Sequence, residues 1–203
     1  MTNLIQTIGA WSISVISTGG YAGLFLLSFL ENLCVPIPSE IVMPFSGYLV
    51  LTGQFNMVWV LAVATIANLL GSIVIYVLAR VGGRPLLERY GKYIFIRLRE
   101  LDKWDSWFMR HGPATVFWLR FVPTGRVLVS IPAGVAKMGF KKFLVYTFAG
   151  SLLWNVILTY IGYAAGQHWD VLHVYFQKFD IVLVMIVVAV IVWWIVRHFK
   201  HRS

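Results

Sequence analysis

Residues 31–40, with the sequence ENLCVPIPSE, place a glutamate at each end of a proline pair in the middle of the apolar run 20–52. Residues 120–126, with the sequence RFVPTGR, place an arginine at each end of a proline–glycine stretch inside the apolar run 111–136. Proline interrupts a helix because it lacks an N–H donor and clashes with the preceding turn. Both runs are therefore expected to be broken helices that carry charge at the break.

The four charged residues at these breaks are Glu31, Glu40, Arg120 and Arg126. One charge at the centre of a bilayer costs about 2.5–3.5 kcal/mol on an insertion scale, so four without partners would cost about 10–14 kcal/mol. That is comparable to the stability of a whole domain. We therefore expect these side chains to face one another, water or a ligand. A carboxylate pair opposite a guanidinium pair indicates a translocation site for an anionic substrate, with a proton or cation involved.

The composition is that of a polytopic membrane protein. Hydrophobic residues make up 59% of the chain and charged residues 12%, and the mean hydropathy is +0.77. The net charge of +9 gathers in residues 80–110, 137–142 and 197–202, which flank apolar segments as the positive-inside rule requires of cytoplasmic loops. Anionic lipids explain this charge, so we expect no nucleic-acid partner. The single cysteine, Cys34, excludes an internal disulfide, and we expect no metal site and no cofactor.

Three apolar segments are expected to span the membrane: 56–79, 143–165 and 181–196. The basic tail places the carboxyl terminus in the cytoplasm, and a lysine-rich stretch places the start of 143–165 on the same side. Residues 1–18 carry no basic residue and predict an interfacial helix, with a spanning helix as the alternative.

The run 111–136 has basic residues of the cytoplasmic side at both ends, so it is expected to enter and leave by one face. Pro123 and Gly125 supply its reversal, because proline has a fixed φ and glycine is free to adopt a positive one. This run is therefore predicted to be a re-entrant hairpin.

Pro36 and Pro38 divide the run 20–52 into halves of about ten to thirteen residues, each about 15–20 Å long as a helix and so half a bilayer deep. This hairpin opens outward, because the span 56–79 that follows it ends in the cytoplasm. Two hairpins of opposite orientation, each followed by a span, form an inverted-topology repeat. Interrupted segments at corresponding positions of such a repeat mark a transporter's midplane site.

The predicted fold class is an all-α polytopic membrane protein: an inverted-topology repeat with two opposed re-entrant helical hairpins and about three full spans. Its predicted parts are an interfacial helix at 1–18; a membrane domain at 19–166, with hairpins at 20–52 and 111–136, spans at 56–79 and 143–165 and a cytoplasmic amphipathic loop at 80–110; and residues 167–203, with an external loop, the last span 181–196 and a basic cytoplasmic tail.

The chain resembles the DedA family of bacterial inner-membrane proteins, whose shared region is also called the SNARE-associated or VTT domain. The resemblance covers about residues 10–165. It rests on the two charged stretches together with PAG at 132–134, GSLLWN at 150–155 and GYAAG at 162–166. It implies transport of a phosphate-bearing lipid, either undecaprenyl phosphate or a phospholipid such as phosphatidylethanolamine, which in some members depends on the proton gradient.

The family's functional arginines correspond to Arg120 and Arg126, and its functional acidic residues to Glu31 and Glu40. Two arginines six residues apart across a turn are suited to a phosphate, which guanidinium groups bind bidentately. The glutamates are expected to act as counter-ions to the arginines or to couple proton binding to transport. The alternative is a purely structural role, in which two internal ion pairs hold the hairpins together.

The leading hypothesis is a lipid transporter, or flippase, in the bacterial inner membrane, with proton dependence. The alternatives are a proton-coupled exporter or ion transporter of small solutes, a lipid phosphatase or phosphotransferase, and an assembly factor without transport. We expect no enzyme, because His111 alone lies near the arginines as a base or nucleophile. The expected partners are membrane lipids, protons or cations, and the sequence allows a homodimer. Asn68 and Asn155 are expected to form hydrogen bonds between spans.

Overall fold

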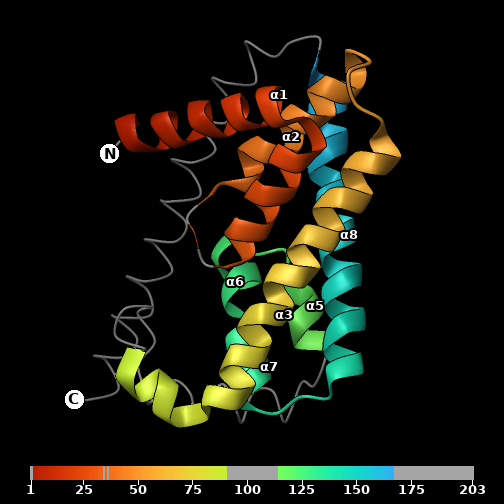
Figure 1. Ribbon diagram of the computed structural model, residues 1–203. Coiled ribbons are helices and arrows are strands. Elements are labelled where there is room, and N and C mark those ends of the chain that lie inside the picture. The colour runs from red at the N-terminus through yellow and green to blue at the C-terminus, as the bar shows by residue number, and fades with distance from the viewer. Residues whose placement is uncertain (1, 34, 36, 91–113, 167–203) are drawn as a thin grey trace, which may run out of the picture. The chain divides into compact units, whose positions relative to one another are not determined.

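A computed structural model describes residues 2–33, 35, 37–90 and 114–166 of the chain. The described residues contain helices and no strands, which confirms the predicted all-α class. The described residues as far as Tyr163 belong to one compact unit, which contains the four charged residues of the two breaks. In chain order the helices are α1 (Thr2–Asn32), α2 (Ser39–Leu51), α3 (Met57–Tyr90), α5 (Ala114–Leu119), α6 (Pro123–Leu128), α7 (Ser130–Val135) and α8 (Phe140–Ala165) (Figure 1).

Three helical segments are long and apolar enough to cross a membrane. Two of them agree with the predicted spans 56–79 and 143–165, and the predicted span 181–196 lies outside the described residues. The three segments are Thr7–Asn32, Met57–Gly82 and Phe140–Ala165. The chain is therefore a multi-pass membrane protein.

Helix α3 continues beyond the predicted span 56–79. The first part of the predicted cytoplasmic amphipathic loop 80–110 is helical, because the backbone stays helical to Tyr90. Residues 86–89 are two leucines, a glutamate and an arginine, all of which favour a helix and outweigh the preceding glycines and proline. The remainder of the predicted loop, residues 91–110, lies outside the described residues.

Helix α1 consists of two pieces that meet at Gly20. The backbone there has φ 58° and ψ −136°, which glycine adopts without a clash because it has no Cβ. Figure 1 shows the chain turning sharply between the two pieces. Residues 2–19 and 21–32 are thus separate helical pieces, and the candidate span Thr7–Asn32 is bent at Gly20.

The second piece of α1 and helix α2 form the two halves of the first broken run. The helix is interrupted between Asn32 and Ser39, where the sequence has its proline pair, and Pro38 with extended backbone immediately precedes α2. The two helices pack against each other and α1 also packs along α3. The break therefore lies where the prolines predicted it.

The second broken run also reverses direction. Near its start, Val116 of α5 packs into one buried cluster with Val129 and Ala133 from the later part of the run. Tyr76 of α3 and Phe143 of α8 complete this cluster, with their rings stacked at a centroid distance of 4.3 Å. The beginning and the end of the run therefore lie together, beside the same end of α3 and α8.

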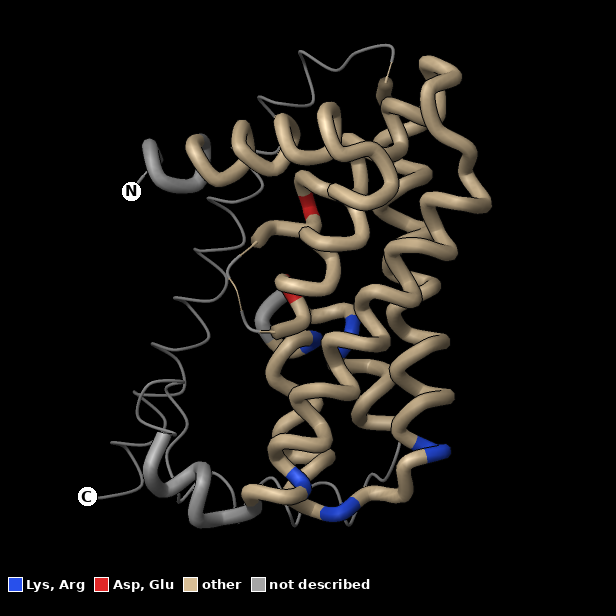
Figure 2. Tube along the Cα trace, in the orientation of Figure 1, with Lys and Arg blue, Asp and Glu red and all other residues tan. Residues whose placement is uncertain are grey.

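That end of the compact unit is basic. Arg80 Nη1 donates a hydrogen bond of 2.7 Å to the hydroxyl oxygen of Tyr76, and this hydroxyl donates to the carbonyl oxygen of Met138. The late part of α3 is thereby joined to the segment that immediately precedes α8. Figure 2 shows the lysine and arginine positions in two groups, one at this end and one inside the helices. The basic residues thus divide into a group at this end of the helices and a group in the interior.

Helices α2 and α8 approach each other through two glycines. A Cβ at Gly47 would overlap the carbonyl oxygen of Thr159, and a Cβ at Gly162 would overlap that of Pro44. Small residues at such positions let the backbones of membrane helices come into direct contact. Gly162 therefore serves packing within the protein.

Candidate functional site

Three of the four predicted charges are buried together in the compact unit. Glu31 lies in the last turn of α1, Arg120 directly follows α5 and Arg126 lies in α6, and their exposed fractions are 6%, 2% and 4%. Glu40, in the first turn of α2, is half-buried. The two helix breaks thus bring distant parts of the sequence to one place inside the helices.

Arg126 has a charged partner. Its Nη2 atom forms an ion pair with Oε1 of Glu31, so the guanidinium of one broken run is joined to the carboxylate of the other. The guanidinium carbon also lies 5.9 Å from the ring centroid of Trp154 on α8, within cation–π range. Arg126 is therefore held between a carboxylate and an aromatic face.

Arg120 is bonded to neutral groups. Its Nη1 donates to Oδ1 of Asn32 at 3.2 Å and to Oγ of Ser72 at 2.9 Å. Its Nη2 donates to Oγ of Ser130 at 3.3 Å and to Oγ1 of Thr147 at 3.2 Å. These acceptors come from four helices and neutralise no charge. Arg120 is therefore a buried cation whose hydrogen bonds are largely satisfied while its charge is not.

A chain of side-chain amides continues from this arginine. Asn32 Nδ2 donates to Oδ1 of Asn68 at 2.8 Å, and Asn68 Nδ2 donates to Oδ1 of Asn155 at 3.3 Å. Asn155 in turn donates to Thr65 Oγ1 at 3.1 Å. The predicted hydrogen bonding of Asn68 and Asn155 between helices is confirmed. This network ties α1, α3 and α8 together around Arg120.

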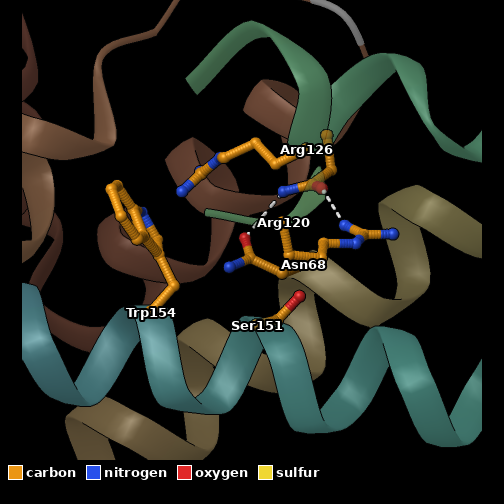
Figure 3. Close-up of a pocket in the computed structure, with 6 residues that line it drawn as sticks. Asn68, Arg120, Arg126, Ser151 and Trp154 are labelled. Atoms are coloured by element: carbon orange, nitrogen blue, oxygen red, sulfur yellow. Dashed lines mark hydrogen bonds between the residues drawn. The ribbon is translucent and has the colours of Figure 1, made fainter. Parts of the chain in front are cut away.

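Both arginines line one pocket (Figure 3). Its empty volume is about 170 Å³, including the part that opens outward, which is less than the roughly 300–1,000 Å³ of most small-molecule pockets. Hydrogen bonds and the ion pair of Arg126 close it from within. A ligand larger than this space can therefore enter only after these side chains separate. The lining residues are Asn32, Asn68, Arg120, Arg126, Ser151 and Trp154.

The pocket also depends on a small residue in α8. A Cβ at Gly150 would lie 2.9 Å from Cγ and 3.0 Å from Cβ of Arg120. A side chain larger than hydrogen would therefore push the stem of the arginine out of its place.

The predicted role of Gly125 is wrong. It was expected to reverse the second run with a positive φ, but among the described residues only Gly20 and Gly53 are glycines with positive φ. The reversal lies at residues 120–122, and Pro123 begins α6, since its fixed φ suits the first turn of a helix. Gly125 instead gives room for packing: a Cβ there would lie 3.1 Å from the Leu119 carbonyl oxygen.

The two glutamates are not equivalent. A structural role for all four charges requires two ion pairs, and the described part of the chain contains the pair of Glu31 with Arg126, whereas Glu40 forms none there. Pro38 precedes α2 as predicted, and Pro36 lies outside the described residues.

Comparison with known proteins identifies the family. Residues 37–164 match the family described as the VTT domain. A protein of Bacillus subtilis named undecaprenyl phosphate transporter A is 37% identical over 170 residues, which are 84% of this chain and 82% of the relative. The chain belongs to the DedA family.

Two further relatives show how this family is named. The protein named DedA of Escherichia coli is 28% identical over 207 residues, 100% of this chain and 89% of the relative. A Lactococcus lactis relative, 33% identical over 195 residues that cover 94% of this chain and 91% of the relative, is named an alkaline phosphatase-like protein. No solved structure matches the chain.

The resemblance to the DedA family predicted the charged residues of the site, and the structure shows that neutral polar residues also belong to it. The partners of Arg120 were not predicted, although two of them follow a readable pattern. Asn68 and Ser72 on α3 are one helical turn apart, as are Thr147, Ser151 and Asn155 on α8, within otherwise apolar helices. Polar residues at four-residue spacing in a span indicate one inward-facing stripe.

Proposed function

We propose that this DedA-family protein moves a lipid with a phosphate headgroup across the bacterial inner membrane. The observation that carries the proposal is the buried Arg120, which shares a pocket with Arg126 and whose positive charge has no carboxylate partner in the described part of the chain. Among the described residues, Glu31 is the one carboxylate in ion-pair contact with these arginines, so the pocket as described holds one excess positive charge. Burying such a charge is costly, and an incoming anionic headgroup compensates it.

The relatives' names support the choice of lipid. The B. subtilis relative is named for undecaprenyl phosphate, whose monophosphate is a suitable ligand for two guanidinium groups. The groups that line the pocket are mainly hydrogen-bond donors and amides, which bind and orient an anion. We therefore propose transport, without hydrolysis of the phosphate.

The test of this function is reconstitution of the full-length protein into liposomes. We expect a fluorescent polyprenyl monophosphate to cross the bilayer faster with the protein than without it, and the corresponding polyprenol to cross at the protein-free rate. The same vesicles with an imposed pH gradient test proton coupling through Glu31 and Glu40. A rate that does not respond to the gradient would reject coupling and leave the glutamates as counter-ions.

We further propose that both broken runs are re-entrant hairpins of opposite orientation. Support comes from the cluster of Val116 with Ala133 and from the basic end formed by Arg80 and the lysines around the start of α8. An inverted repeat of this kind places its breaks near the bilayer midplane, where the pocket would be reached alternately from the two sides. The carboxyl terminus is then cytoplasmic.

The topology gives a direct prediction for cysteine labelling. Single cysteines at Ala114 and Ala136, both exposed, should react with a membrane-impermeant maleimide from the cytoplasmic side, in a chain whose own Cys34 is replaced. A cysteine at Gly53, in the exposed turn after α2, should react from the opposite side. Labelling of the first two positions from different sides would contradict the second hairpin.

A further inference from the structure

The pocket contains two donors that the internal network leaves unused. Nε of Arg120 and Nε1 of Trp154 are buried and have no hydrogen-bond partner. Both groups can only donate, since neither guanidinium nor indole nitrogen carries an acceptor. A buried donor without a partner loses the free energy of its hydration, about 1–3 kcal/mol. The missing partner must therefore be an acceptor.

Trp154 is well placed to take part. It lies on α8 three residues after Ser151, which lines the same pocket, and its ring faces the guanidinium of Arg126 at 5.9 Å. Figure 3 shows the indole nitrogen on the edge of the ring that is turned toward the other side chains of the pocket. The free N–H is therefore on the pocket side, on the ring that faces Arg126.

Charge decides what the acceptor is. A water molecule would accept hydrogen bonds from the two free donors but would leave the excess positive charge of Arg120 and Arg126 over Glu31 uncompensated. A phosphate oxygen supplies both the acceptor and the negative charge, and charge-assisted hydrogen bonds are about twice as strong as neutral ones. An oxyanion is therefore the ligand that satisfies donors and charge together.

We propose that Trp154 is a direct ligand of the phosphate: its Nε1–H and the Nε–H of Arg120 donate hydrogen bonds to the headgroup oxygens. This inference rests on the proposed transport of a phosphate-bearing lipid and adds a residue to its binding site. Arg120 is already anchored through both of its Nη atoms, so it presents Nε without moving. Trp154 gives the site a donor that carries no charge and attracts no additional counter-ion.

The test compares two tryptophans in the full-length protein. Trp154→Phe keeps an aromatic ring but removes the N–H, and Trp118→Phe makes the same change at an exposed position. Binding to detergent-solubilised protein is measured with a fluorescent polyprenyl monophosphate and with the matching polyprenol. We expect Trp154→Phe to lower the preference for the phosphate over the alcohol by at least about tenfold, the effect of losing a hydrogen bond to a charged group. Trp118→Phe should leave this preference unchanged.

A second variant separates the N–H from the ring. Incorporating 3-benzothienylalanine at position 154 keeps two fused rings but has no N–H, and it should reproduce the loss of preference. A variant with weaker binding of both lipids to the same degree would show that Trp154 serves packing alone and would overturn the inference. So would an unchanged preference in both variants, with the wild type still preferring the phosphate.

The wild type distinguishes the failure of this inference from that of the proposed function. If wild-type protein binds the phosphate and the alcohol equally, the proposed function fails and the inference falls with it.

Inorganic phosphate as a competitor identifies the source of the anion. If inorganic phosphate displaces the labelled lipid from the wild type but not from Trp154→Phe, the site binds the phosphate group itself. A lack of displacement, with the preference still dependent on Trp154, supports binding of the headgroup only with its lipid chain.

Discussion

The Glu31→Gln variant is expected to accumulate poorly and to unfold at much lower denaturant concentration than the wild type. Glu31 and Arg126 form a buried ion pair, and removal of one partner leaves the other charge uncompensated. Breaking a buried pair in this way costs about 3–5 kcal/mol, a large share of the stability of most proteins. The measurement is the yield of monodisperse protein in detergent, together with its unfolding midpoint.

Two controls make this expectation specific. Glu40→Gln removes a half-buried glutamate outside the described ion pair and should leave the unfolding midpoint close to that of the wild type. The double variant Glu31→Gln with Arg126→Gln should recover most of the lost stability, since no buried charge is stranded, yet it should not transport. A stable Glu31→Gln single variant would contradict the importance of this pair.

Arg120→Lys is expected to reduce transport by at least about 100-fold while the protein still inserts. The guanidinium donates to four side-chain oxygens in two directions, and a lysine ammonium has three donors at one point and cannot reproduce that fork. A hydrogen bond to a charged group contributes about 1.5–3 kcal/mol. The loss of two is therefore at least about 3 kcal/mol, and each 1.4 kcal/mol is a factor of ten.

Arg126→Lys is the matched comparison. Lysine at this position keeps a charge for Glu31 and loses mainly the contact with the face of Trp154, so the effect on transport should be smaller. Both rates are measured in liposomes at equal protein content, with the phosphate-bearing lipid used for the wild type. Equal transport rates for Arg120→Lys and the wild type would show that the four hydrogen bonds donated by Arg120 are not needed for transport.

The helix breaks and the buried charges could be predicted because their signals are local. Proline restricts the backbone conformation of its own residue and of the one before it. The helix interruption before Ser39 can therefore be predicted from a short stretch of sequence. The cost of a charge in lipid is likewise independent of the fold, which is why Glu31, Arg120 and Arg126 were expected inside.

The partners of those charges could not be predicted, because they depend on how the helices are rotated. Nothing in the sequence distinguishes the roles of Glu31 and Glu40. In the structure Glu31 lies in the last turn of α1 and Glu40 in the first turn of α2, and Arg126 contacts Glu31. Which hydroxyls face Arg120 is also set by packing. Gly125 was misread because a glycine that gives room to a neighbour looks the same in sequence as one that turns the chain.

The contact between α2 and α8 has a consequence for biosynthesis. Gly47 fits against Thr159, a residue 112 positions later in the chain. At roughly 5–20 residues per second, the ribosome needs between about 6 and 22 seconds to make the intervening stretch. During that time the partner surface for α2 does not yet exist, although α1 is complete at the start of the interval and α3 is made within it. Helix α2 therefore waits with one face uncovered, and a ribosome that stalls before α8 leaves that face exposed to quality-control proteases.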